Sequence, residues 1–153
     1  MSKKSLLFLI PLLPIFLSCG STGCYDETDV KVYCSFYSIS KGAAVSLDSL
    51  SVWGVGSDSL IYKKQTISQL ALELNPNSTK TQYVVQSKTG NYVFTDTLTF
   101  IHTNKPWYES KDCDCMVFST LDTCLTTGGI FQYATIPDHN IINYEKTHVV
   151  LHL

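Results

Sequence analysis

Six cysteines are the residues of this chain most suited to chemistry, and two of them, Cys113 and Cys115, are separated by only one residue. On a strand, residues at this spacing point to one face about 6.6 Å apart, near the upper limit for a disulfide. The flanking carboxylates of Asp112 and Asp114 disfavour the reactive thiolate. We therefore expect structural cysteines, and keep a thiol-redox protein using Cys113 and Cys115 as an alternative.

Two other groups have the residue types of metal ligands. His148 and His152 would lie about 13 Å apart on one face of a strand, too far for one ion, so we expect surface histidines. The acidic run 26–29 (DETD) lacks the glycine and the distal glutamate of a calcium loop, which favours a solvated turn. Calcium-dependent adhesion stays as a second alternative. No catalytic residue, metal site or cofactor is predicted.

Exposed aromatic residues are the remaining candidates for ligand contact. Trp107 follows a proline and, with Tyr108, lies in a predicted loop, where both could stack on a sugar ring. Trp53 lies within a strand pattern and is predicted to be core. The chain has no arginine and a formal net charge of −2, which counts against nucleic-acid binding.

The elements that must position these residues are strands, because apolar residues recur with a period of two. The pattern is clearest at Val32, Cys34 and Phe36, and again where Leu98, Phe100 and His102 share one face. The stretch 83–94 (YVVQSKTGNYVF) predicts a hairpin. No stretch has a convincing helical period, so we predict an all-β fold, a single immunoglobulin-like β-sandwich of two sheets over residues 30–153.

The N-terminus has the parts of an export signal. Lys3 and Lys4 precede the apolar run 6–17, which is too short to span a bilayer. The run ends in Phe16-Leu17-Ser18-Cys19, which resembles the lipobox cut by bacterial lipoprotein signal peptidase. This resemblance implies a lipoprotein signal peptide over residues 1–18, a diacylglycerol on Cys19 and a lipidated tether over residues 19–29. Cys24 is the rival acceptor, but a polar triplet precedes it.

The mature chain resembles a family of small uncharacterised lipoproteins of the Bacteroidota envelope. The likeness rests on the stretches CYDETDVKVYCSFYS, DSLSVWGVGSDSLIY and DTLTFIHTNKPWYESKDC, although Asp114 stands where the family's Ser-x-x-Cys motif continues with glycine. The resemblance implies a disulfide between Cys24 and Cys113 and no established activity. It also implies an outer-membrane lipoprotein, and the uncharged residues 20–23 after Cys19 favour the periplasmic face.

Three Asp-Ser/Thr-apolar triplets match an O-glycosylation signal that resembles that of exported Bacteroidota proteins. The candidate acceptors are Ser49, Ser59 and Thr97; in the alternative interpretation, each preceding aspartate starts an Asx-turn. Three cysteines lie in apolar strand patterns and are expected to be small buried hydrophobic residues, namely Cys34, Cys115 and Cys124. The sequence thus predicts a non-catalytic, lipid-anchored envelope protein that binds a protein or glycan partner or supports the envelope.

Overall fold

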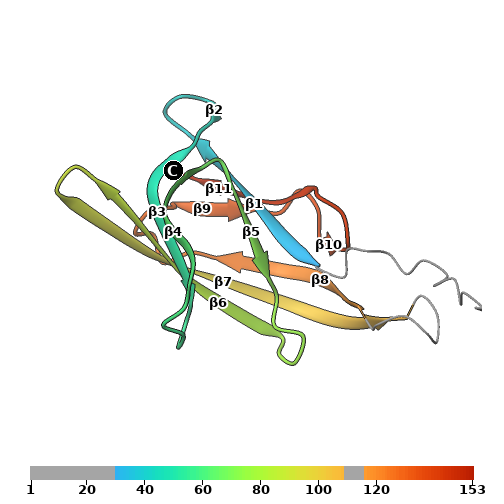
Figure 1. The fold of residues 1–153 in the computed structure, drawn as a ribbon. Helices are drawn as coiled ribbons and strands as arrows, with labels where there is room; N and C mark the ends of the chain where they lie inside the picture. Colours follow the sequence, from blue (N-terminus) through green and yellow to red (C-terminus); the bar gives the residue numbers. More distant parts are fainter. Residues whose placement is uncertain (1–29, 109–115) are drawn as a thin grey trace, which may run out of the picture.

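The computed structural model describes residues 30–108 and 116–153, which form strands and loops without any helix in these two ranges (Figure 1). Accordingly, this part of the chain contains no helix that could cross a membrane. Its strands are β1 (Lys31–Ser38), β2 (Ala43–Ala44), β3 (Leu47–Gly54), β4 (Leu60–Ile67), β5 (Gln69–Glu73), β6 (Lys80–Thr89), β7 (Tyr92–Trp107), β8 (Met116–Leu125), β9 (Tyr133–Thr135), β10 (Asn140–Ile141) and β11 (Thr147–His152).

The strands form two sheets that pack against each other, which confirms the predicted all-β sandwich (Figure 1). One sheet has the order β2-β1-β11-β9, with β5 also paired to β1, and the other has the order β10-β8-β7-β6-β3-β4. β1 and β11 pair in parallel, with Cys34 opposite Val149 and Phe36 opposite Leu151. The first and last described strands are therefore direct neighbours inside one sheet.

The core lies between the sheets and follows the predicted alternation. Val32, Cys34 and Phe36 of β1 point inward and are at most 1% exposed. The ring of Phe36 stacks on that of Phe131, with 5.8 Å between the ring centroids. Burying one such side chain fully stabilises the fold by about 1.5–3 kcal/mol. Other fully buried core residues are Leu50, Val52, Leu70, Val85, Leu98, Phe100, Leu121, Ile141, Val149 and Leu151.

Two tyrosines, on β4 and β6 of one sheet, form hydrogen bonds with β5 at the edge of the other sheet. The chain passes from β4 to β5 through the single residue Ser68 and so changes sheets. The Tyr62 hydroxyl accepts the Ala71 N–H at 2.9 Å and donates to the Ala71 carbonyl at 3.2 Å. The Tyr83 hydroxyl donates to the Glu73 carbonyl. These contacts satisfy backbone groups on β5 that would otherwise form an open sheet edge.

The predicted hairpin is present, and its strands run further than expected. Thr89 pairs with Tyr92, so only Gly90 and Asn91 form the turn, and Gly90 has a φ of 60°. A glycine at this first central position suits the twist of a two-residue hairpin. Because β3 pairs with β6 only as far as Gln86, the hairpin tip extends beyond the sheet (Figure 1).

A buried carboxylate on β7 fastens the loop between β8 and β9. Asp96 is 1% exposed. Its Oδ1 accepts the N–H and hydroxyl of Thr127 at 2.7 and 2.6 Å, and its Oδ2 accepts the N–H groups of Ile130 and Phe131 at 3.0 and 2.9 Å. Burial alone would raise the pKa of Asp96, but these hydrogen bonds together hold the pKa below its ordinary value of 3.8.

The same loop requires a glycine at its closest approach to β7. A Cβ added to Gly129 would lie 1.9 Å from the Thr95 carbonyl oxygen, which no side chain tolerates. The Asp96 hydrogen bonds and the Gly129 approach together seat Phe131 in the core, where it meets Phe36.

We expect Asp96→Asn to lower the free energy of unfolding by about 2–3 kcal/mol at pH 7, because the amide replaces an acceptor with a donor facing backbone N–H groups. Urea denaturation measures this loss. Asp48→Asn is the matched control, since the exposed Asp48 accepts only a hydroxyl, at 2.9 Å from Thr66. In acid the difference should shrink, because the wild-type contribution is lost as the pH falls through the lowered pKa of Asp96. Equal losses in both variants would contradict the role given to Asp96.

Candidate functional site

The two cysteines that the structure describes are enclosed. Cys34 on β1 and Cys124 on β8 are buried and free. Burial and the neighbouring Cys124 raise the pKa of Cys34 well above 9.0, while burial and the charge of Asp96 raise the pKa of Cys124 to about 12. Both thiols stay protonated, so the expectation of small buried hydrophobic residues is confirmed. The lipidation, disulfide and redox predictions concern cysteines outside the described residues, namely Cys19, Cys24, Cys113 and Cys115.

A second enclosed group centres on His102 of β7, which is fully buried. Its Nε2 lies 2.9 Å from the Thr81 Oγ1, and its Nδ1 lies 2.8 Å from the Asn104 Oδ1. A hydroxyl, an imidazole and an amide in this order can activate a nucleophile in hydrolases. Here the Asn104 amide also accepts the Ser119 hydroxyl at 2.8 Å and donates to the carbonyls of residues 75, 76 and 78 at 2.8–3.0 Å.

The surroundings of His102 indicate a structural clamp. Thr81 borders a cavity of about 490 Å³, but His102 is not among the residues that line it. The Thr81 hydroxyl oxygen also accepts the Asn75 N–H at 2.8 Å. Each nitrogen of the imidazole and each polar atom of the Asn104 amide has a protein partner, as is usual for buried polar groups that stabilise a fold. The network therefore holds the β5–β6 loop against β7.

His148 lies in a β-bulge and is fully buried, so the prediction of a surface histidine is wrong. Tyr33 pairs with Thr147 and Cys34 pairs with Val149, which leaves His148 as one extra residue on β11. The imidazole Nδ1 accepts the Tyr33 N–H at 3.1 Å, and the Tyr33 ring stacks on the imidazole with 5.9 Å between centroids. A bulge redirects one side chain in this way, and strict alternation does not predict it.

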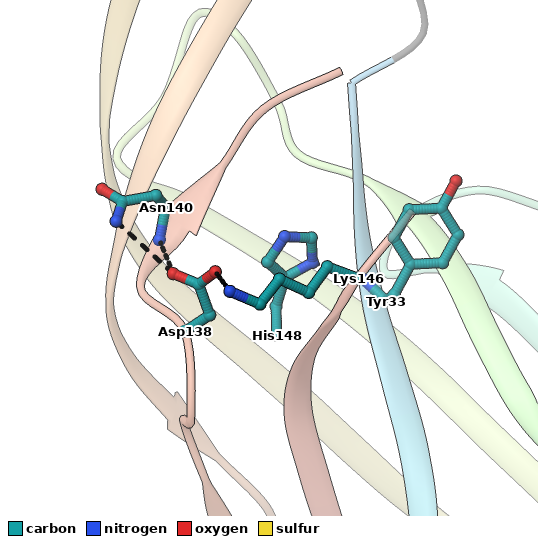
Figure 2. Close-up of polar contacts among 5 residues, drawn as sticks. All are labelled: Tyr33, Asp138, Asn140, Lys146 and His148. Atoms are coloured by element: carbon teal, nitrogen blue, oxygen red, sulfur yellow. Dashed lines mark hydrogen bonds and ion pairs between the residues drawn. The ribbon is translucent and has the colours of Figure 1, made fainter. Parts of the chain in front are cut away.

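His148 lies beside an ion pair between Lys146, directly before β11, and Asp138, in the loop before β10 (Figure 2). Lys146 Nζ lies 2.8 Å from Asp138 Oδ2, and the Asn140 N–H donates to Asp138 Oδ1 at 3.0 Å. The hydrogen bonds from Lys146 and Asn140 lower the pKa of Asp138 to about 2. Burial lowers the pKa of His148 and outweighs the attraction of Asp138. The Nε2 atom of His148 has no hydrogen-bond partner among the described residues.

An aromatic groove lies where β7 ends and β8 begins. We define it by Trp107, Met116, Phe118, Asn143 and Tyr144, which line a cavity of about 460 Å³. The rings of Trp107 and Phe118 are stacked, with 5.6 Å between centroids and 21° between planes. This contact follows from the register, because Met116 is opposite Trp107 and Phe118 lies two residues further along β8. The described residues of the groove present aromatic faces to solvent and include one amide side chain, that of Asn143.

Both aromatic residues predicted for ligand contact are exposed at this end of the sandwich. Trp107 is 47% exposed and forms part of the groove, while the adjacent Tyr108 is 67% exposed. Trp107 ends β7 rather than lying in a loop. Sequence reasoning missed Tyr144, which is 54% exposed and reaches the groove from the loop between β10 and β11. No local periodicity marks a residue so far along the chain from Trp107.

The predicted glycosylation acceptors lie on separate elements. Ser49 on β3 is half-buried with a φ of 50°, Ser59 in the loop before β4 is exposed, and Thr97 on β7 is half-buried. The Asx-turn interpretation fails at Asp96, whose carboxylate binds the distant loop described above. Modification of these hydroxyls stays a prediction, and exposure makes Ser59 the most accessible of the three acceptors.

Trp53 and the remaining metal candidates complete the set of sequence predictions. Trp53 is half-buried, so its prediction as core is wrong: Leu50 and Val52 take the buried positions of β3, and Trp53 alternates outward. His152 is half-buried and stacks on Tyr133, with 4.3 Å between centroids. No group of three or more His, Cys, Asp or Glu side chains in the described ranges could hold a metal ion. The acidic run 26–29 lies outside those ranges.

Comparison with known proteins yields one match. A family model described as "Family of unknown function (DUF6452)" matches residues 49–153, which is more than half of the chain. No curated protein and no solved structure matches. The matched range begins within β3 and includes every residue of the aromatic groove.

We expect the free energy of unfolding to fall as the pH drops below 6.5, because the unfolded chain binds a proton at His148 more readily than the folded chain, in which the pKa of this group is lowered. His148→Gln should flatten this part of the pH profile, as measured by urea denaturation between pH 7.5 and pH 5. The control is the range above pH 7.5, where His148 is neutral in both the folded and the unfolded chain, so that wild type and His148→Gln should have the same slope there. An unchanged slope in His148→Gln would show that the buried imidazole does not couple to folding.

Native protein at pH 8 should leave Cys34 and Cys124 unalkylated by iodoacetamide, because both thiols are buried and their pKa values are raised. Peptide mass mapping follows each site separately. The same protein in concentrated urea is the control and should be alkylated at both positions. Rapid modification of either thiol in the folded state would overturn the structural role.

Proposed function

We propose that this chain, which belongs to the DUF6452 family of unknown function, is a lipid-anchored, non-catalytic domain of the cell envelope that acts by binding through its aromatic groove. The observation that carries the proposal is the position of the groove. The end of β7 and the start of β8, which carry Trp107, Met116 and Phe118 of the groove, lie at the end of the sandwich where β1 begins (Figure 1). In the sequence, the predicted tether of residues 19–29 comes directly before β1.

The anchor is supported by the sequence. The lysine-led apolar run and the lipobox-like tetrapeptide ending at Cys19 have the composition and order of a lipoprotein signal, and the resemblance to Bacteroidota envelope lipoproteins agrees with it. Dual or triple acylation of one cysteine gives stable attachment, since each buried methylene contributes about 0.8 kcal/mol. We place the domain on the periplasmic side of the outer membrane because residues 20–23 are uncharged.

Binding is favoured over catalysis by the way the described nucleophiles and bases are enclosed. Cys34 and Cys124 are buried with raised pKa values, and the imidazole of His102 is held by two side chains inside the fold. The groove, by contrast, exposes large aromatic faces. Exposed aromatic residues gathered in a concave surface are typical of recognition sites. The redox alternative at Cys113 and Cys115 and the calcium alternative concern residues outside the described ranges.

We expect Cys19→Ser to move the protein from the membrane fraction to the soluble fraction when it is expressed in a bacterium with lipoprotein signal peptidase, because the variant lacks the sulfur that receives the diacylglycerol. Immunoblots of the two fractions measure the change, and mass spectrometry of the wild-type N-terminal peptide detects the acyl groups. Cys24→Ser is the matched control and should partition like the wild type. A Cys19→Ser protein that remains cleaved and membrane-bound would refute the anchor.

A further inference from the structure

We propose that the occupant of the aromatic groove is the surface of the bilayer itself, at the boundary between lipid headgroups and acyl chains. The domain then rests on the membrane that holds its anchor, with the groove in contact with the lipid. This inference rests on the proposed function, because it takes the anchor to bring the groove to the membrane. It names the partner of the groove and gives the domain a fixed orientation.

The first argument is reach. The described part of the chain begins at Val30, directly before β1, and the anchor is predicted eleven residues earlier at Cys19. Eleven extended residues span at most about 40 Å, and a shorter path leaves the start of β1 close to the lipid. Tyr33 pairs with Thr147, only three residues after Tyr144 of the groove. The groove therefore cannot be far from the membrane whenever the start of β1 is near it.

The second argument is the chemistry of the lining. Of the five described residues that line the groove, four are aromatic or apolar, and the fifth, Asn143, carries an amide. Among the described groove residues, the side-chain hydrogen-bonding groups are the Trp107 N–H, the Asn143 amide and the Tyr144 hydroxyl, which are few for a sugar site. Tryptophan and tyrosine are instead enriched at the membrane interface, where the ring enters the apolar layer and the N–H or O–H faces water. Trp107 and Tyr144 are half exposed and suited to this position.

The third argument is charge. The chain has no arginine and a formal net charge of −2, so attraction to anionic headgroups is not what draws the groove to the lipid. Apolar and aromatic contact alone is weak for so small a surface, and it becomes effective because a tether keeps the local lipid concentration high. The contact between the groove and the membrane should therefore form on zwitterionic vesicles and persist at high salt.

The two tryptophans of the chain allow a direct test. The probe is the mature chain from residue 19 carrying Cys19→Ser and an N-terminal histidine tag, held on phosphatidylcholine vesicles by nickel-chelating lipid. With Trp53→Phe, Trp107 is the single reporter. We expect its emission to shift to shorter wavelength and to be quenched by lipids brominated on their acyl chains. With Trp107→Phe instead, the remaining Trp53 on β3 should show neither change.

Paired aromatic variants test the orientation. In the Trp53→Phe background, Tyr144→Ala should reduce the quenching of Trp107, whereas Tyr92→Ala should leave it unchanged. Tyr92 is 74% exposed and stands at the far end of β7 from Trp107, about 50 Å away along an extended strand. Circular dichroism of each variant confirms that its sandwich is intact.

Each result decides the inference. If Trp107 on tethered protein keeps its emission wavelength and remains as accessible to aqueous acrylamide as without vesicles, the proposed contact between the groove and the membrane is wrong. If the fluorescence of Trp107 does not change with lipid but changes with soluble neutral oligosaccharides, the groove is a carbohydrate site and the proposed membrane contact is also wrong. Because the nickel lipid replaces the natural acyl chains, these outcomes do not depend on whether cells acylate Cys19, which the fractionation experiment decides separately.

Discussion

The parallel pairing of β1 with β11 is the constraint on which the rest of the molecule depends. It joins strands from opposite ends of the described chain, and it continues beyond the strands where the Leu153 N–H donates to the Tyr37 carbonyl at 2.9 Å. Closing so long a loop costs conformational entropy that only the completed core can offset. The pairing also returns the β10–β11 loop to the start of β1. The aromatic groove and the entry of the chain into the domain therefore share one end of the sandwich.

β7 organises the opposite sheet in a comparable way. It is the longest described strand, and it carries both buried polar groups that hold distant loops, Asp96 for the β8–β9 loop and His102 for the β5–β6 loop. Each group is fully buried and surrounded by hydrogen-bond partners. Because these hydrogen bonds need particular partners, they fix the place of each loop more specifically than apolar contacts would. The loops are thus fixed from within, and the ends of β7 are left to carry exposed aromatic residues.

The distribution of reactive and exposed side chains follows from this construction. Among the described residues, Cys34, His102 and His148 lie inside the fold, where burial suppresses their charged forms or hydrogen bonds occupy them. Exposed aromatic residues lie at both ends of β7, with Tyr92 and Phe94 at one end and Trp107 at the other. These exposed aromatic residues are the feature that supports our proposal of a tethered binding module.

The sequence by itself determined the strands, the inward faces of β1 and β7 and the Gly90 turn, because the pleat and the turn depend on neighbouring residues. The sequence also predicted that Trp107 is exposed, but it placed this residue in a loop, whereas the structure places it at the end of β7. Only the tertiary structure decided that His148 is buried in a bulge, that Asp96 holds a loop thirty residues away and that Tyr144 meets Trp107. These contacts depend on strand register and on which distant segments pack together, and both are set by the free energy of the whole core rather than by any local pattern.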